Sequence, residues 1–265
     1  MNVGLDHWLC RELPAELARR PGFQGLAIGG SHGTGEADEH SDLDLFVLVA
    51  EDRLAEALRG EIELVPETIG TDQARYLPEF GVRIAVLSAC FGLVEFFFLT
   101  ESTVLPTPLR AKNRMLWDPC GRFAALLASS IRAARDPAVV RRHRNGAAVD
   151  FLIGYTSAVK SLRRGHYGAC LTRLDRARNL VFNALVSGDQ WWPTHGVPTR
   201  DALAAVGLWT TFLDTVPTAD PASARWALLV LGRLGRDLIT ADPLCSDLVR
   251  RHAAEALATI ARDLT

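Results

Sequence analysis

Two acidic residues, Asp42 and Asp44, stand at the start of an apolar run that ends at Val49. Residues two apart on a strand point to the same face of a sheet, so the two carboxylates should project together. Like charges at that spacing repel each other, and a divalent cation relieves the repulsion. Paired carboxylate oxygens are ligands that suit Mg²⁺. The spacing therefore predicts a metal site of the kind that serves phosphoryl-type transfer.

A glycine-rich turn precedes the two acids. The apolar strand expected at Phe23–Ile28 leads into Gly29 and Gly30, which permit tight or positive-φ geometry and a close approach of the backbone to a ligand. Ser31 and Thr34 add hydroxyls that, together with backbone amides, could cradle phosphates. The turn is followed by no Gly-Lys-Ser/Thr and does not match the GxGxxG dinucleotide fingerprint. The joint pattern of strand, turn, polar spacer, two acids and strand predicts a nucleotide-phosphate site.

This pattern resembles the nucleotidyltransferase superfamily that includes DNA polymerase β. The signature is Gly-Ser at the end of one strand and two acids flanking an apolar residue on the next, here Gly30-Ser31 and Asp42-Leu43-Asp44. The nearest likeness is to the small bacterial antibiotic nucleotidyltransferases, which adenylylate aminoglycosides or lincosamides. The resemblance implies a transferase that uses two Mg²⁺ ions and moves NMP, most simply AMP from ATP although another NTP stays open, to a hydroxyl of a small molecule such as an antibiotic.

A third acid, Glu95, is the single charge inside the apolar run GLVEFFFLT. A carboxylate in such a run needs a partner or a metal if it is buried. One alternative is an edge strand with Glu95 turned to water. The resemblance implies instead that Glu95 is the third metal-binding carboxylate, on a strand beside that of Asp42 and Asp44. Its longer arm could also make it the general base on the acceptor hydroxyl.

The remaining pattern predicts an α+β chain in two parts. A nucleotidyltransferase domain of the polymerase β type, a mixed sheet flanked by helices, is expected over residues 1–120. An all-α bundle that binds the acceptor is expected over residues 121–265. Helices are expected at residues 6–20, 51–59, 123–135, 138–164, 167–186, 222–239 and 246–264, and strands at residues 23–28, 43–49, 82–87, 93–99 and 114–118.

The helical half offers candidates for binding the two substrates. The resemblance implies a basic residue on the triphosphate, for which Lys160 is the first choice and Arg173 and Arg176 are weaker ones; a solvated helix face is the alternative. The segment SGDQWWPTHG carries Trp191, Trp192 and His195, an aromatic set that could wall a small-molecule site or join the domains. This half is not conspicuously rich in acidic residues, which weakens an aminoglycoside as acceptor and leaves room for a neutral or less cationic one.

Composition limits the partners. The net charge of −2 over 265 residues gives no basic footprint and disfavours a nucleic-acid substrate. No apolar run reaches membrane-spanning length, no signal-peptide core opens the chain, and the five cysteines show no pairing pattern. These features predict a cytoplasmic enzyme that is a monomer or a homodimer. The alternative is a regulatory or antitoxin-like minimal nucleotidyltransferase that modifies or docks a protein partner.

Overall fold

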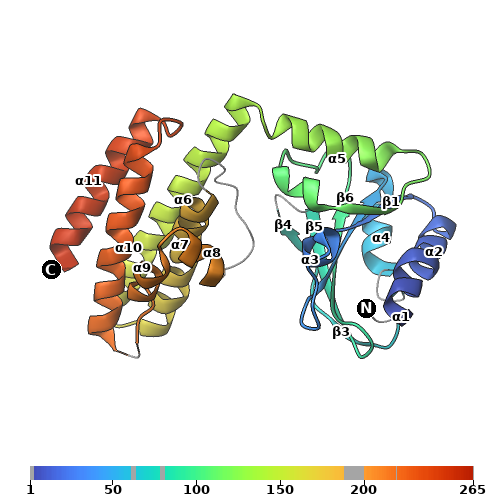
Figure 1. Ribbon diagram of the computed structural model, residues 1–265, viewed down its shortest axis with the longest axis horizontal. Helices are drawn as coiled ribbons and strands as arrows, with labels where there is room; N and C mark the ends of the chain where they lie inside the picture. Colours follow the sequence, from blue (N-terminus) through green and yellow to red (C-terminus); the bar gives the residue numbers. More distant parts are fainter. Residues whose placement is uncertain (1–2, 61–63, 78–80, 188–199, 219, 265) are drawn as a thin grey trace. The chain divides into compact units, whose positions relative to one another are not determined.

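The computed structural model describes residues 3–60, 64–77, 81–187, 200–218 and 220–264. Contacts divide the chain into two compact units, residues 1–136 and 137–265. The first contains a β-sheet with helices, and the second is built from helices (Figure 1). The predicted α+β class is therefore confirmed. None of the described helices is long and apolar enough to cross a membrane.

Among the described residues, seven strands form one mixed sheet in the order β3-β5-β6-β2-β1-β7, and the short β4 also pairs with β5. β2 and β6 run parallel, whereas the other neighbours are antiparallel. The parallel pair lies at the middle of the sheet. The strands are β1 Phe23–Ile28, β2 Leu43–Val49, β3 Thr68–Thr71, β4 Arg75–Leu77, β5 Gly81–Ser88, β6 Gly92–Leu99 and β7 Arg114–Trp117.

One face of the sheet is covered by the N-terminal helices and by α4. The N-terminal segment is continuous through α1 Val3–His7, the π-helical turn η1 Trp8–Glu12 and α2 Leu13–Arg19, with Pro14 in the first turn of α2, where a missing N–H is tolerated. The short η2 Glu51–Arg53 leads into α4 Leu54–Gly60. This core contains, among others, Trp8, Leu13, Leu17, Leu45, Val47, Ala57, Phe96 and Phe98.

The opposite face is covered in part by α5, Arg122–Ala133. Phe123 is fully buried and Leu127 nearly so, and both pack on apolar side chains of β1, β2 and β6. The helix starts where the Asp118 carboxylate accepts a hydrogen bond from the N–H of Ala124 at 2.8 Å. A carboxylate at a helix N-terminus satisfies amides that have no partner inside the helix. Because α5 packs on the sheet, the first unit extends to residue 136, beyond the boundary expected at residue 120.

The second unit consists of helices in its described part. They are α6 Pro137–Arg163, α7 Tyr167–Ser187, α8 Arg200–Ala205, α9 Trp209–Asp214, α10 Pro221–Ala241 and α11 Asp247–Leu264. Phe151 and Tyr155 of α6 lie in its core, and the Tyr155 hydroxyl donates to the carbonyl of Leu228 at 2.9 Å. The helical period over residues 138–164 predicts an apolar stripe of Val149, Leu152, Ile153, Thr156, Val159 and Leu162. In the structure, however, Val149 and Ile153 are 40% and 60% exposed. The buried face of α6 is thus rotated from the expected one.

A buried ion pair fixes the connection between α10 and α11. Arg144 of α6 donates to Asp242, the residue after α10, at 2.9 Å, and both side chains are less than 10% exposed. The Asp242 carboxylate also accepts from the backbone N–H of Leu244 at 2.9 Å. A paired charge with extra hydrogen bonds is tolerated in a core, whereas either member alone is costly.

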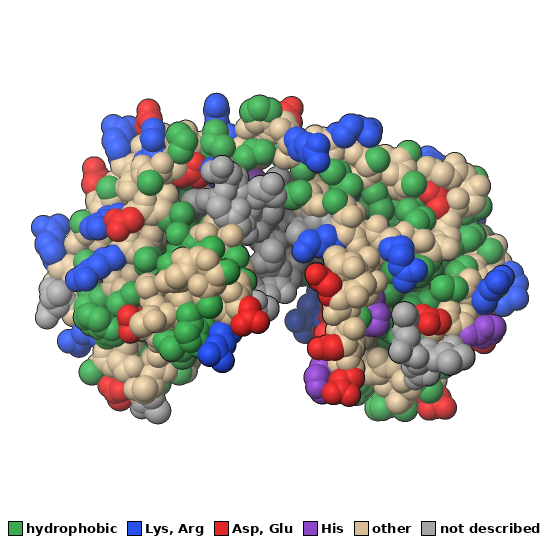
Figure 2. Space-filling view, in the orientation of Figure 1, with side chains coloured by type: hydrophobic (Ala, Val, Ile, Leu, Met, Phe, Trp, Pro, Cys, Tyr) green, Lys and Arg blue, Asp and Glu red, His purple; other side chains and the backbone are tan. Residues whose placement is uncertain are grey.

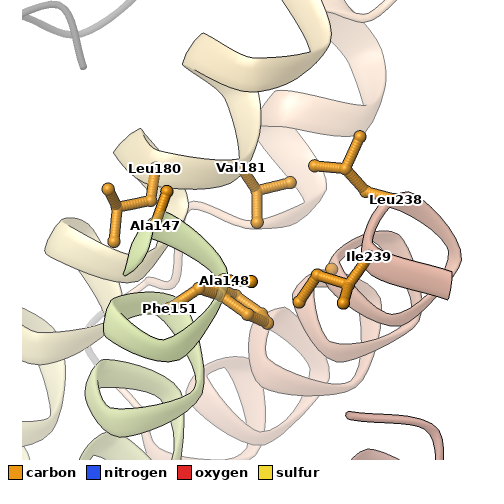
Figure 3. Close-up of a pocket in the computed structure, with 8 residues that line it drawn as sticks. Ala147, Ala148, Phe151, Leu180, Val181, Leu238 and Ile239 are labelled. Carbon is orange, nitrogen blue, oxygen red and sulfur yellow. The ribbon is translucent and has the colours of Figure 1, made fainter. Parts of the chain in front are cut away.

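A small apolar cavity lies among α6, α7 and α10 (Figure 3). Its wall consists of hydrocarbon side chains and the Gly235 backbone, with no polar side chain among the residues that line it. Such a space offers no hydrogen-bond donor or acceptor to a water molecule or to a polar substrate. It is a packing void of the helical core. The lining residues are Ala147, Ala148, Phe151, Leu180, Val181, Gly235, Leu238 and Ile239.

Candidate functional site

The glycine turn of the first unit forms a short helix, α3 Gly30–Thr34, directly after β1. The N–H of Gly29 donates to the carbonyl of Asp44 at 2.8 Å, and the N–H of Gly33 donates to the carbonyl of Gly29 at 2.7 Å. The first bond ties the turn to β2 at one of the two predicted metal ligands. The turn and the acidic strand are therefore held together by the backbone.

Gly30 is required by its place beside Asp44. Its φ is +55°, a conformation that side chains with a Cβ rarely adopt, and a Cβ at this position would overlap the Asp44 Oδ2 oxygen. The carboxylate therefore lies against bare backbone. This close approach is the structural reason for a glycine at the second position of the turn.

The acidic side chains predicted as ligands converge at the middle of the sheet. Asp44 of β2 is in direct register with Glu95 of β6, and the two carboxyl groups are close enough to share a hydrogen bond. Asp42 lies exposed just ahead of β2, and its charge acts on Asp44. Because β6 lies between β5 and β2, the edge-strand alternative for Glu95 is wrong.

The electrostatics of Asp44 reflect this crowding. Burial, followed by the neighbouring charges of Glu95 and Asp42, raises its pKa to about 6, while Arg83 acts in the opposite direction. Both burial and like charge disfavour the ionised form of a carboxyl group. The site thus holds more negative charge than its surroundings balance, which is the condition a cation relieves.

Arg83 of β5 is a site residue that the sequence analysis did not single out. Its Nε donates to Glu95 Oε1 at 2.8 Å, its Nη2 bonds the same oxygen, and its Nη1 lies 3.6 Å from Asp72 Oδ2. A sequence signal existed, because Arg83 is the only charge in the strand expected at residues 82–87, as Glu95 is in its own strand. Lone opposite charges on two apolar strands indicate a cross-strand pair.

The 3₁₀ turn η4, Pro108–Lys112, supports the glycine turn from the other side. A Cβ at Gly33 would overlap the carbonyl oxygen of Lys112, and Arg110 is buried with its guanidinium 4.8 Å from the centre of the Phe46 ring. Asn113, which follows η4, has its Nδ2 buried without a hydrogen-bond partner in the described part of the chain. No sequence motif marked this segment as part of the site.

The two predicted phosphate-binding hydroxyls, those of Ser31 and Thr34, differ in their contacts. Ser31 is half-buried in α3. The Thr34 hydroxyl donates within the turn, with the Ser31 carbonyl at 3.1 Å and Glu36 Oε2 at 2.9 Å, so it is engaged locally. The segment between α3 and β2 is polar and exposed, and acidic and histidine side chains gather below α3 on the face drawn in Figure 2. Phosphate binding by this turn rests on its backbone and on Ser31.

The other predicted substrate-binding residues belong to the helical half of the chain. Lys160 is exposed on α6, in the second unit. Trp191, Trp192 and His195 lie outside the described residues. Their roles stay predictions.

The donor set fits a hard divalent cation in chemistry and charge, since it offers carboxylate oxygens with excess negative charge. Within the described residues, no three Asp, Glu, His or Cys side chains are gathered closely enough to hold a metal ion as they stand. One oxygen of Glu95, Oε1, is bonded to Arg83. Asp44 with one oxygen of Glu95 and the exposed Asp42 remain the residues that could hold a cation.

Comparison with known proteins agrees with this geometry. Residues 10–88 match the family model of the nucleotidyltransferase domain, a segment that includes the turn, Asp42, Asp44 and Arg83. A search of curated proteins gave no match.

Two solved structures share low sequence identity with the chain. A nucleotidyltransferase-like protein from Exiguobacterium sibiricum is 11% identical, with 94% of this chain and 78% of that chain covered and a TM-score of 0.43. An aminoglycoside 6-adenyltransferase from Bacillus subtilis is 10% identical, with 94% of both chains covered and a TM-score of 0.37. At these TM-scores neither structure bears on the substrate.

Proposed function

We propose that this chain, whose residues 10–88 match the model of the nucleotidyltransferase domain, is an enzyme that moves NMP, most simply AMP from ATP, to a hydroxyl of a small molecule. The observation that carries the proposal is the register of Asp44 with Glu95, next to a glycine turn that is hydrogen-bonded to Asp44. This arrangement supports the proposal, because it brings the glycine turn and the paired carboxylates to one point of the sheet.

The carboxylates are the proposed cation ligands. Asp42, Asp44 and Glu95 would hold two Mg²⁺ ions, which supply charge neutralisation for the triphosphate and activation of the acceptor oxygen. The raised pKa of Asp44, about 6, supports this assignment because the crowded carboxyl resists ionisation without a nearby cation. The approach of Asp44 to the bare backbone of Gly30 supports it as well, since it keeps the carboxylate beside the phosphate-binding turn.

The turn is proposed to hold the triphosphate. Gly29 and Gly30 allow the backbone to approach it, and Ser31 adds a hydroxyl. Thr34 would act through its backbone and through the shape of α3, because its hydroxyl is bonded inside the turn. Lys160 of the helical unit is the proposed positive partner of the phosphates.

The transfer itself exchanges one P–O bond for another. The acceptor oxygen forms a bond to the α-phosphorus, the bond between that phosphorus and the bridging oxygen breaks, and pyrophosphate leaves. Glu95 is the proposed general base that takes the proton of the acceptor hydroxyl. Positioning and charge neutralisation supply most of the rate enhancement in such reactions.

The proposed acceptor is a small molecule in the cytoplasm, with antibiotics as candidates. The net charge of −2 supports a small acceptor over a nucleic acid. The helical half is not conspicuously rich in acidic residues, which supports an acceptor with little positive charge. Trp191, Trp192 and His195 are proposed to wall its site.

Calorimetric titration with ATP, GTP, CTP and UTP, each with and without Mg²⁺, tests the proposal. We expect Mg²⁺-dependent binding of at least one nucleotide, and loss of that binding in the double variant Asp42→Asn/Asp44→Asn. Asp52→Asn, which removes a carboxylate 79% exposed in η2, serves as the matched control and should bind normally. Absence of binding by the unaltered protein, or equal binding by the double variant, would overturn the proposal.

A further inference from the structure

Arg83 lies next to the proposed reacting groups without being one of the acids. In the antiparallel pair of β5 and β6, Ala85 is opposite Glu95 and Arg83 is two residues away on the same face. Its side chain therefore reaches Glu95 along the diagonal of the sheet. The Arg83 side chain is 20% exposed and the Glu95 side chain is 17% exposed, so the pair is largely shielded from solvent.

The contacts of Arg83 are directional. Nε and Nη2 both donate to Oε1 of Glu95, and Nη1 lies 3.6 Å from Oδ2 of Asp72. The planar guanidinium is thus held at two edges, one on each side of the strand. Only a fork with several nitrogens can make this set of contacts, because a lysine offers a single nitrogen.

The bonding of Glu95 is one-sided. Nε and Nη2 of Arg83 both donate to one carboxylate oxygen, Oε1, and neither of these two hydrogen bonds uses Oε2. On the other side, Asp44 is close enough to share a hydrogen bond with Glu95. Glu95 therefore stands between a fixed cation on β5 and a carboxyl group on β2, and its rotation is restrained from the β5 side.

We propose that Arg83 is a positioning residue of the transfer site, which holds Glu95 by one oxygen and leaves the other for the cation or for the acceptor proton. The inference rests on the proposed function, since it assigns Arg83 a role through Glu95. Outer partners of metal-binding carboxylates orient them in this way, and their loss typically costs about 10–100-fold in metal affinity or activity.

The substitution Arg83→Lys separates positioning from charge. Lysine keeps the positive charge beside Glu95 but loses the double contact with Oε1 and the contact with Asp72. Arg75→Lys is the matched control, because Arg75 is the cross-strand partner of Arg83 and pairs with Asp72 but has no bond to Glu95. The two variants make the same chemical change one strand apart.

Mn²⁺ is the probe, since carboxylate sites that accept Mg²⁺ also accept Mn²⁺. In calorimetric titrations without nucleotide, we expect Arg83→Lys to bind Mn²⁺ at least about tenfold more weakly than the unaltered protein, and Arg75→Lys to bind it equally well. With nucleotide, pyrophosphate release by Arg83→Lys should slow by a similar factor, with the KM for the nucleotide changed less than about twofold, as for an interaction that matters mainly in the transition state.

Several results would overturn the inference. Unchanged Mn²⁺ affinity in Arg83→Lys would mean that charge alone, or fold stability alone, is what Arg83 supplies. If Arg83→Lys does not fold, Asp72→Asn provides the second test, because it removes the outer anchor of Arg83 from an exposed position. We expect this variant to weaken Mn²⁺ binding in the same direction by a smaller factor, and unchanged affinity would again contradict the role.

Failure of the inference can be told apart from failure of the proposed function. If the unaltered protein binds Mn²⁺ and the double variant Asp42→Asn/Asp44→Asn does not, the site exists and the Arg83→Lys result decides on Arg83 alone. If the unaltered protein binds no Mn²⁺ and no nucleotide, the proposed function and the role of Arg83 both fall.

Discussion

Asp44→Asn should make the ligand-free sheet unit more stable at pH 8. The pKa of Asp44 is raised from 3.8 to about 6 in the folded protein. A shift of that size corresponds to about 3 kcal/mol, which the folded state loses when Asp44 ionises. Asparagine has nearly the same shape and no charge, so it avoids this cost. The gain in the free energy of unfolding should therefore approach 3 kcal/mol above pH 7, as an upper limit.

The pH dependence gives the sign of the effect. A carboxyl group with a raised pKa stabilises the folded state fully while it is protonated, below the unfolded pKa near 4, and this contribution is lost as the pH rises through 6. The difference between Asp44→Asn and the unaltered protein should accordingly be small at pH 4 and large at pH 8. Asp42→Asn, at an exposed position, should give a smaller gain.

The assay must follow the sheet unit separately, because a chain of two compact units need not unfold in one step. Urea titrations in EDTA, read by pulsed hydrogen exchange of peptides from β2 and β6, report on the strands that carry Asp44 and Glu95. The reasoning would be refuted if Asp44→Asn gave no gain at pH 8, or an equal gain at pH 4. A refutation would also remove the electrostatic support for a cation at these carboxylates.

Two further substitutions test the local structure. Gly30→Ala should destabilise the sheet unit by about 1–3 kcal/mol and abolish nucleotide binding, because its φ of +55° and the adjacent Asp44 oxygen leave no room for a Cβ; Gly35→Ala, at φ +79° in open space, should retain binding in the same calorimetric assay. Asp242→Leu should lower the free energy of unfolding of the helical unit by about 3–5 kcal/mol, since Arg144 would remain buried without its carboxylate. Urea titration followed by hydrogen exchange of α6 and α10 measures the second effect, and a loss below 1 kcal/mol would contradict it.

The two central strands, β1 and β2, could be predicted from the local sequence pattern. The strands at Phe23–Ile28 and Leu43–Val49 were found with their observed bounds, because a continuous apolar run between turn residues is a strong signal. Asp42 and Asp44 were singled out by their spacing at the start of a strand, and Glu95 as the one charge inside an apolar run; their role as ligands stays a prediction. β3 and β4 were missed: they are short and mostly exposed, so their residues carry no hydrophobic alternation that a sequence pattern can detect.

Long-range contacts could not be predicted in the same way. The pairing of Arg83 with Glu95 depends on the register of β5 and β6, and the support of the glycine turn by η4 joins segments far apart in the chain. The rotation of α6, which exposes Ile153 and buries Phe151, depends on which neighbours pack on it. A helical period shows that an apolar face exists but does not select between two overlapping faces when both are apolar.

The parallel pairing of β2 with β6 has a consequence for the order in which the enzyme matures. During synthesis β2 meets β1 first, whereas β6 emerges only after α4, β3, β4 and β5. Until then a nearly all-apolar strand has one edge open, which is a hazard for association between nascent chains. A nascent chain that has reached Ser88 holds the turn, Asp42 and Asp44 but not Glu95. Closing the sheet and bringing Glu95 beside Asp44 are therefore the same event, so under the proposed function a half-made chain would lack one of its three carboxylates.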